Sequence, residues 1–222
     1  MNTNYSHQAR LGMTVDLVIF TVNTDKLKVL LTKRAEAPFS GFWSLPGGFL
    51  LIDESLEEAA RRVLKEKTGV KDVYLEQLYT FGKPDRDPRA RVITVTYFAL
   101  IPWANLDQPE SKKVADLNWV SVDQVPNLAF DHKEILNCAV QRLRAKVSYS
   151  NIVYGLMPDK FRLSELQKMY EIILDDQLDK RNFRKRMLAS GLLQDTGKKD
   201  LLGAHRPAML YQFKKMEITF LN

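Results

Sequence analysis

The feature that most constrains the fold is the segment from Gly47 to Val70, "GGFLLIDESLEEAARRVLKEKTGV", because it carries its own helix start and helix stop. Ser55 and Glu58 have the spacing of a capping box, in which each side chain binds a backbone N–H of the first helical turn. Gly69 stands where a helix often ends in a left-handed residue. The segment therefore predicts a helix over residues 55–68 with a loop on each side.

Strand-like and helix-like segments alternate around this helix. Residues 13–37 contain two β-rich runs around the turn sequence "NTDK", which predicts a hairpin. Residues 73–82 and 91–101 predict two further strands, Trp119 and Val120 predict a short one, and residues 133–147 predict a second helix. Interleaved strands and helices are typical of an α/β or α+β domain, which we expect to end near residue 148.

Composition gives further limits. The 222 residues are 45% hydrophobic and 27% charged, as in ordinary soluble proteins, and no apolar run approaches the ~18 residues that a membrane span needs. The first residues lack the apolar core of a secretory signal. We therefore expect a cytoplasmic protein with no membrane partner. Cys138 is the only cysteine, so no internal disulfide can form, and its helix-like surroundings favour a buried structural thiol.

The sequence changes character after about residue 150, where strand-like segments give way to helical ones. "LSELQKMYEIILDD" has apolar residues at helical spacing, and Ser164 with Gln167 fits a capping box. After a short turn, Asp179 has the position of an N-cap for "KRNFRKRMLAS", and Gly191 follows as a stop signal. Two strand-like runs, "LLQDTG" and "AMLYQF", are then joined by the basic connection "KKDLLGAHRP". This order predicts a winged helix-turn-helix.

The second helix of this domain combines apolar and basic residues. Phe183, Met187 and Leu188 can face inward, which leaves the cationic residues and Asn182 outward, where a helix in the DNA major groove contacts base edges and phosphates. A solvated basic face is the alternative, but residues 151–222 contain 13 Lys and Arg against 9 Asp and Glu, concentrated on this helix and the wing. The predicted DNA-binding residues are Lys180, Arg181, Asn182, Arg184 and Lys185 in the helix and Lys198, Lys199, His205 and Arg206 in the wing.

The first domain resembles the Nudix hydrolases. The residues that match the long signature of that family at the correct spacing are Gly48, Glu54, Arg62, Leu64, Glu66, Gly69 and Val70. In the family, three acids at helix positions i, i+3 and i+4 hold divalent metal against a diphosphate. This chain has Val63, Glu66 and Lys67 there. The resemblance thus implies that hydrolysis is lost or severely weakened, and we expect no catalytic residue, no metal and no cofactor.

Lys67 has two interpretations. Its ammonium group can replace part of the metal's charge beside a diphosphate and so turn a cleaving site into a binding site. Alternatively, Lys67 points to solvent and only makes the helix more soluble. A further alternative for the segment is that Glu54, Glu57 and Glu58 recruit a metal by another route.

A second basic segment, "TFGKPDRDPRARVITVTY", resembles the Nudix branch that handles ADP-ribose, as does "FDH" at 130–132. Its arginines can bind an anionic ligand, and Phe81 can stack on a base. A charged surface loop is the alternative, and His132 is placed as well to cap the next helix as to touch a ligand. The predicted effector-binding residues are Arg34, Gly47, Gly48, Arg62, Glu66, Lys67, Phe81, Arg86, Arg89 and Arg91.

Nearly the whole chain resembles the Nudix-related transcriptional regulators of NAD metabolism, the NrtR group. The resemblance implies an α+β fold with a Nudix α/β/α sandwich around a mixed sheet in residues 1–150 and a winged helix-turn-helix in residues 151–222. It also implies a homodimer that represses genes from a pseudo-palindromic double-stranded operator and senses ADP-ribose or a related NAD metabolite. Two alternatives stay open: an active ADP-ribose diphosphatase, which could also be bifunctional, and a regulator of the same layout that responds to arabinose.

Overall fold

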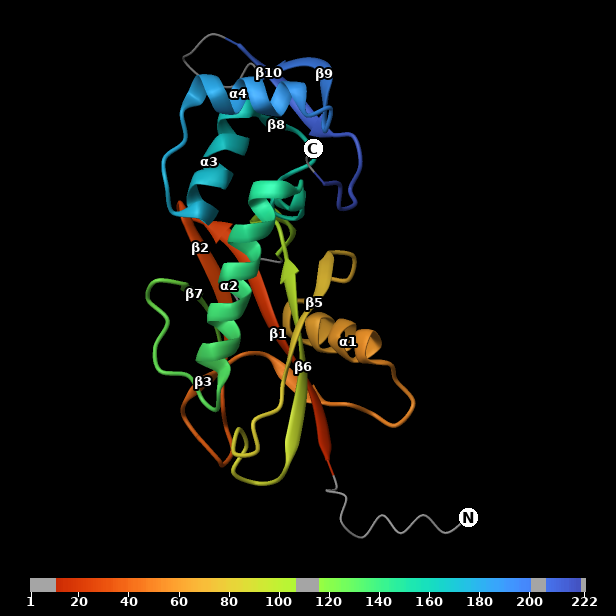
Figure 1. The fold of residues 1–222 in the computed structure, drawn as a ribbon, viewed down its shortest axis with the longest axis vertical. Coiled ribbons are helices and arrows are strands. Elements are labelled where there is room, and N and C mark those ends of the chain that lie inside the picture. Colours follow the sequence, from red (N-terminus) through yellow and green to blue (C-terminus); the bar gives the residue numbers. More distant parts are fainter. Residues whose placement is uncertain (1–10, 107–115, 201–206, 221–222) are drawn as a thin grey trace.

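A computed structural model describes residues 11–106, 116–200 and 207–220, which form two domains joined end to end (Figure 1). The strands are β1 (Gly12–Asn23), β2 (Lys26–Lys33), β3 (Trp43–Ser44), β4 (Gly47–Phe49), β5 (Tyr74–Phe81), β6 (Val92–Leu100), β7 (Leu117–Ser121), β8 (Phe161–Arg162), β9 (Leu193–Asp200) and β10 (Ala208–Phe213). The α-helices are α1 (Leu56–Thr68), α2 (His132–Tyr149), α3 (Leu163–Leu174) and α4 (Lys180–Ala189), with short 3-10 helices η1 (Trp103–Asn105) and η2 (Ile152–Leu156). Within these residues, no helix combines the length and apolarity needed to span a membrane.

The first domain is built on a seven-stranded mixed sheet. Five strands follow the order β3-β2-β1-β6-β5, while β4 pairs with β1 and β7 pairs with β2. β1 and β6 run parallel, and the other strand pairs run antiparallel. Helix α1 lies on one side of the sheet and α2 on the other (Figure 1). The predicted α+β sandwich with a mixed sheet is confirmed.

Strand β1 is buried on both faces, which explains its nearly continuous apolar sequence. Leu17 and Ile19 pack in the cluster that contains α1 residues, whereas Val18 and Phe20 pack in the cluster that contains α2 residues. Successive side chains of a strand point to opposite faces, so a strand covered by helices on both sides is apolar at most positions. β1 is therefore the central strand of the sheet, and the residues in its middle lie in the interior of the domain.

The second domain has the expected winged-helix order. Helices α3 and α4 precede the hairpin of β9 and β10, and β8 adds a third strand in the order β8-β10-β9. Tyr170 of α3 packs edge-on against Phe183 of α4, with their ring centroids 5.2 Å apart. These residues belong to the same apolar cluster as Leu143 and Val147 of α2 and Val153 of η2. One continuous core therefore connects the sheet of the first domain to the second domain.

Most predicted element signals are confirmed. The hairpin turn contains Thr24 and Asp25 with φ values of 50° and 58°. Ser55 and Glu58 form the predicted capping box, and Gly69 ends α1 with a φ of 75°. Gly191 follows α4 with a φ of 71°. Local signals between neighbouring residues were thus sufficient to locate these ends.

Three local predictions were wrong. Helix α3 begins at Leu163, so Ser164 and Gln167 form no capping box; the carboxylate of Glu165 instead accepts the backbone N–H of Arg162 at 2.7 Å. Leu188 is 46% exposed instead of facing inward, because α4 buries only a narrow strip through Phe183 and Met187. The ninth strand continues through Lys198 and Lys199 to Asp200 instead of ending at residue 197.

Candidate functional site

A cleft of about 340 Å³ opens between β1, β2, β4, the loop before β6 and the start of α2. Six predicted effector-binding residues line it: Arg34, Gly47, Gly48, Lys67, Arg86 and Arg89. The size lies within the range of small-molecule sites. Lys67 is half-buried and belongs to this lining, so it does not simply point to solvent.

Two other signature residues, Glu54 and Arg62, hold the loop before α1. Arg62 donates from Nη2 to Glu54 Oε1 at 2.6 Å and from Nε to Oε2 at 2.9 Å. The Leu51 N–H also donates to Glu54 Oε1 at 2.8 Å. The Arg62 hydrogen bonds lower the pKa of Glu54 to about 2, so this carboxylate is charged at neutral pH. Arg62 is therefore tied to the loop and does not line the cleft.

The positions that hold metal in the Nudix signature do not fit a divalent cation here. Val63 is buried in the core and has no donor atom, and Lys67 brings a positive charge to the cleft. Glu66 is exposed, with Arg62 Nη1 at 3.5 Å from its carboxylate. A hard cation takes six or more oxygen ligands, several of them carboxylates or carbonyls. Among the described residues, no group of three or more His, Cys, Asp or Glu side chains is placed to hold a metal.

The other acids considered as metal ligands, Glu57 and Glu58, also form hydrogen bonds within the protein. Glu57 accepts from Arg61 Nη2 at 2.7 Å, and Glu58 accepts the Ser55 N–H at 2.7 Å. Both bonds lie along α1 or at its start, and neither residue lines the cleft. The carboxylates of α1 therefore stabilise the helix and its loop in this structure.

The floor of the cleft is a buried polar network. Arg86 forms a two-bond ion pair with Asp131, at 2.7 and 2.9 Å, and its Nη2 lies 3.4 Å from Asp16 Oδ2. His132 accepts the Leu45 N–H on Nδ1 at 2.9 Å, and its Nε2 lies 3.8 Å from Asp16. Burial lowers the pKa of His132, so the imidazole is neutral at pH 7. With Nδ1 accepting, the proton is on Nε2 and faces Asp16.

The close approach of β4 to this polar floor requires a glycine at position 47. A Cβ atom built on Gly47 would lie 2.1 Å from Asp16 Oδ1 and 2.8 Å from the Val15 carbonyl oxygen. Both distances are shorter than van der Waals contact allows, and the Val15 oxygen belongs to the backbone. The strand pairing of Gly47 with Asp16 therefore brings β4 backbone directly over the buried carboxylate.

The second domain presents a basic surface. Phe183 and Met187 of α4 are buried. The predicted DNA-contact residues within the described ranges, Lys180, Arg181, Asn182, Arg184, Lys185, Lys198 and Lys199, are all exposed. Asp179 caps the helix by accepting the Asn182 N–H at 2.8 Å. His205 and Arg206 lie outside the described residues. A groove of about 550 Å³ separates α4 from the wing and the start of α3, with Lys180, Arg184, Lys199 and Arg162 on its walls.

Comparison with known proteins decides the family. A family model for the Nudix domain matches residues 11–138, and a model for the NrtR DNA-binding winged helix domain matches residues 153–213. A protein of Acinetobacter baylyi described as an "ADPR responsive transcriptional repressor NtrR" is 42% identical over 94% of this chain and 84% of its own length. The chain belongs to the NrtR family.

Solved structures of NrtR agree in both domains. Shewanella oneidensis NrtR in complex with a 27mer DNA has a TM-score of 0.82 and 41% identity, covering 91% of this chain and 93% of that one. The Nudix domain of the same NrtR in complex with ADP ribose has a TM-score of 0.54 and 42% identity, covering 64% of this chain and 94% of that one. An "ADP-ribose pyrophosphatase" of Methanocaldococcus jannaschii is 38% identical over 49% of this chain and 63% of its own length.

In this NrtR member, four of the predicted effector-binding residues lie away from the cleft. Arg62 binds Glu54 in the loop before α1, and Glu66 is exposed beside Arg62. Arg91 donates from Nη1 to the Gly82 carbonyl oxygen at 2.7 Å. Phe81 was predicted to stack on a base, but its ring packs in the core on the α2 side of the sheet. A β-bulge in β5 between Gln77 and Tyr79 turns it inward.

Sequence reasoning missed two residues of this cleft, Asp16 and Asp87, which line it and are both buried. Phe130, noted in the sequence as part of "FDH", also lines it. Asp87 binds Arg89 at 2.7 and 3.0 Å, which fixes the loop before β6. One available signal was the lone acid in the apolar run "VDLVIF", because a buried carboxylate in a central strand needs a partner and often belongs to a site.

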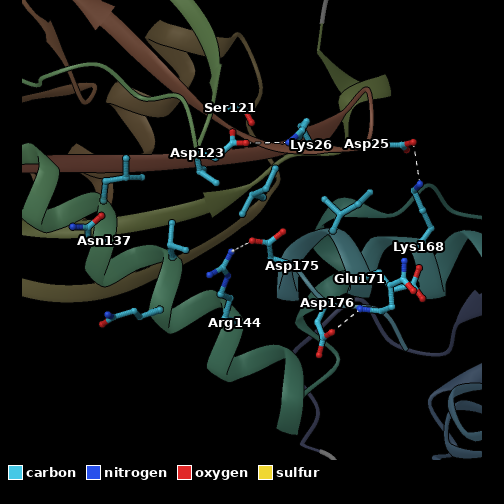
Figure 2. Close-up of a pocket in the computed structure, with 17 residues that line it drawn as sticks. Asp25, Lys26, Ser121, Asp123, Asn137, Arg144, Lys168, Glu171, Asp175 and Asp176 are labelled. Atoms are coloured by element: carbon cyan, nitrogen blue, oxygen red, sulfur yellow. Dashed lines mark hydrogen bonds and ion pairs between the residues drawn. The ribbon is translucent and has the colours of Figure 1, made fainter. Parts of the chain in front are cut away.

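A second, larger groove of about 650 Å³ lies at the junction of the two domains of this NrtR chain. Figure 2 shows charged residues from both domains facing across it. Lys168 of α3 lies 2.9 Å from Asp25 in the β1–β2 turn, and Arg144 of α2 lies 3.7 Å from Asp175 at the end of α3. These exposed ion pairs cross the junction, where the continuous apolar core joins the winged helix to the Nudix domain.

Proposed function

We propose that this chain is a transcriptional repressor that binds operator DNA through residues 151–222 and releases it when ADP-ribose binds in residues 1–150. The proposal includes a cytoplasmic homodimer on a pseudo-palindromic operator, since two copies of α4 then contact two half-sites. The observation that carries it is the presence, in one chain, of an exposed basic α4 and a Nudix cleft with Lys67 in place of a metal-binding acid.

ADP-ribose is supported by the chemistry of the cleft. Arg34, Lys67 and Arg89 bring positive charge to its lining, as a diphosphate requires. Asp16 and Asp87 are buried carboxylates that can accept hydrogen bonds from ribose hydroxyls. The Acinetobacter baylyi relative is described as ADPR responsive, and the Shewanella oneidensis Nudix domain was crystallised with ADP ribose. We propose the same effector class for this chain.

We further propose that the bound effector is not hydrolysed. Water activation in a Nudix site needs divalent metal, and Val63 and Lys67 remove two of the three acids that hold it. An uncut ligand can act as a signal because its occupancy follows its concentration. The second candidate, an ADP-ribose diphosphatase, is favoured only by the partial similarity to the Methanocaldococcus jannaschii pyrophosphatase.

A release assay separates these two functions. The protein is incubated with ADP-ribose and Mg²⁺ or Mn²⁺, and AMP and ribose 5-phosphate are measured by chromatography, with a Nudix ADP-ribose pyrophosphatase as the positive control. We expect no release above the protein-free background. Robust turnover would show that the cleft is an active site and would contradict the proposal.

A thermal-unfolding screen tests the identity of the effector. A ligand that binds only the folded state raises the unfolding temperature in proportion to the logarithm of its excess over the dissociation constant. We expect ADP-ribose to raise the midpoint and arabinose to leave it unchanged. The opposite pattern would instead support the arabinose-responsive alternative.

The two sites must be coupled for repression to respond to the effector. A ligand shifts DNA binding only by its difference in affinity for two arrangements of the protein, and a tenfold effect needs ~1.4 kcal/mol. The half-sites of an operator fix the spacing of two recognition helices. A small rotation of the winged helices on the Nudix dimer therefore suffices to misalign one of them.

A further inference from the structure

The chain returns to the domain junction after the winged helix is complete. The last strand, β10, ends at Phe213, and the family model for the winged helix matches no further than this residue. Residues 214–220, which we call the C-terminal segment, lead back to the end of α2. Phe220 forms an isolated antiparallel bridge with Ser150, and its ring stacks on Tyr149 with centroids 6.1 Å apart. The winged helix is therefore attached to the first domain at both ends of its own chain.

Asn151 binds the C-terminal segment as a neighbouring strand would. Its backbone N–H donates to the Thr219 carbonyl oxygen at 3.0 Å. Its side-chain Nδ2 donates to the Glu217 carbonyl oxygen at 2.9 Å, and its Oδ1 accepts the Thr219 N–H at 2.7 Å. A side-chain amide has both a donor group and an acceptor, so it can pair with the backbone groups of an extended segment. Three hydrogen bonds between distant parts of the chain thus meet at one residue.

The contact is buried as well as hydrogen-bonded. Asn151 is 1% exposed, and Ile218, between its two partner residues, packs against the apolar core that joins the domains. A buried amide that loses its partners costs more free energy than its hydrogen bonds contribute when they are formed, because water does not reach it. The C-terminal segment therefore supplies the partners that the buried Asn151 side chain needs.

Asn151 lies in the connection between the domains. Helix α2 ends at Tyr149, and the 3-10 helix η2 begins at Ile152, so Ser150 and Asn151 alone separate the two elements. When domains rotate, the backbone changes are absorbed by a few residues at the ends of rigid elements. The C-terminal segment binds at such a position, where a small change of backbone direction moves the whole second domain.

Helix α4 is held at the same place. Arg186 of α4 donates from Nη2 to the Ser148 carbonyl oxygen, in the last turn of α2, at 3.1 Å. A domain held by one chain connection can turn about that connection, whereas additional attachments beside it restrict the turn. The C-terminal segment and Arg186 therefore both restrict the angle between α4 and α2.

From these contacts we propose that the C-terminal segment fixes the angle of the winged helix on the first domain, with Asn151 as the positioning residue. Asn151 is buried, so it acts on DNA binding through the placement of α4. This role rests on the proposed function, since the angle matters when two copies of α4 must meet two half-sites at a fixed spacing. The residues that contact DNA and the residue that sets their spacing are then separate.

Thr219→Pro tests this role without changing the buried Asn151. Proline has no N–H, so the variant lacks the donor to Asn151 Oδ1. Thr219→Ala is the matched control, because it removes the side chain and keeps the N–H. A duplex selected by the protein from a random-sequence pool, with two half-sites, is compared with a duplex that keeps one half-site.

Thr219→Pro should weaken binding to the two-site duplex about tenfold and leave binding to the one-site duplex unchanged, since each winged helix is intact. Asn151→Ala should show the same pattern in fluorescence anisotropy, and Thr219→Ala should bind as the wild type does. Thr219 lies near the end of the chain and outside the strands of the second domain, so Thr219→Pro keeps the test valid where Asn151→Ala fails to fold.

The outcomes separate this role from the proposed function. A wild type that selects no duplex overturns both. Wild-type binding with unchanged affinities in Thr219→Pro overturns the positioning role alone. Equal losses on the two duplexes also overturn it, because they would show that the C-terminal segment only supports the fold of the winged helix.

Amide hydrogen exchange of the full-length protein tests the attachment without DNA. In the wild type, the peptide that contains residues 214–220 should exchange at least about tenfold more slowly than an unstructured peptide, because its N–H groups are hydrogen-bonded at the junction. Asn151→Ala should remove this protection and leave that of α1 unchanged. Exchange of the wild-type segment at the rate of an unstructured peptide would overturn the attachment, whatever the result with DNA.

Discussion

Arg144 Nε, on the last turns of α2, donates a 2.9 Å hydrogen bond to the carbonyl oxygen of Ile173 at the end of α3. The same guanidinium lies 3.7 Å from the Asp175 carboxylate. One side chain of the Nudix domain therefore contacts both a backbone carbonyl and an acid of the winged-helix domain. Helix α2 begins at His132 on the floor of the cleft that we propose as the effector site. One continuous helix thus runs from the proposed effector site to the DNA-binding domain.

Arg144→Ala tests this connection. Loss of the Arg144–Ile173 hydrogen bond should lower the free energy of unfolding by about 1 kcal/mol, since the exposed ion pair with Asp175 adds little. The variant should also show a weaker effect of ADP-ribose on DNA affinity. Lys26→Ala is the matched control: Lys26 lines the same groove, but its hydrogen-bonded ion pair is with Asp123 of its own domain. If both variants keep the full effector response in a DNA-binding titration, Arg144 does not transmit the signal.

The buried His132 predicts a dependence of stability on pH. Burial holds the pKa of His132 below its ordinary value of 6.5, so the unfolded chain binds this proton more readily than the folded one. The free energy of unfolding should therefore be constant in this respect above pH 6.5 and fall as the pH drops below it.

His132→Asn provides the comparison, because the amide oxygen can still accept the Leu45 N–H but does not titrate. Urea unfolding at about pH 7.5 and about pH 5.5 should show a smaller loss of stability in the variant than in the wild type. Equal losses would mean that other groups account for the acid sensitivity.

Lys67 is predicted to bind the diphosphate directly. Lys67→Glu replaces an attractive charge by a repulsive one and should weaken ADP-ribose binding by at least about tenfold, or ~1.4 kcal/mol. Lys65→Glu makes the same charge change on an exposed position of α1 outside the cleft. Calorimetric titration should find the loss in Lys67→Glu alone; similar losses in both variants would indicate a general charge effect.

Arg184 is predicted to contact a base edge. Arg184→Ala should weaken binding to a duplex selected by the protein from a random-sequence pool by about 1–3 kcal/mol, with a smaller loss on unrelated DNA. Arg61→Ala serves as the control, since Arg61 is an exposed arginine of α1 paired with Glu57. Fluorescence anisotropy measures both, and an unchanged affinity of Arg184→Ala for the selected duplex would remove Arg184 from the interface.

The elements that could be predicted from the sequence are those whose ends are set by interactions between residues close together in the chain. Ser55, Glu58 and Gly69 define α1 within one segment, and Asp179 with Gly191 bounds α4 in the same way. Their partners are a few positions away, so the pattern itself contains the interaction. The winged-helix order and the mixed sandwich follow from the sequence of such elements.

The floor of the cleft could not be predicted because its members are far apart in the chain. Arg86 meets Asp16 across 70 positions and Asp131 across 45. The prediction for Phe81 failed because the β-bulge between Gln77 and Tyr79 breaks the alternation of side-chain directions along β5. No residue type in this segment indicates a bulge. The predicted cap at Ser164 was wrong because α3 begins one residue earlier, and the Glu165 carboxylate accepts the Arg162 N–H.

In the proposed function, an effector held in the Nudix cleft releases DNA from the winged helix. The most direct measurement is the anisotropy of a labelled, protein-selected duplex during titration with ADP-ribose in the presence of Mg²⁺. The proposed function predicts that saturating ADP-ribose lowers DNA affinity by about tenfold or more. ADP-ribose that binds tightly by calorimetry and leaves the DNA affinity unchanged would contradict it.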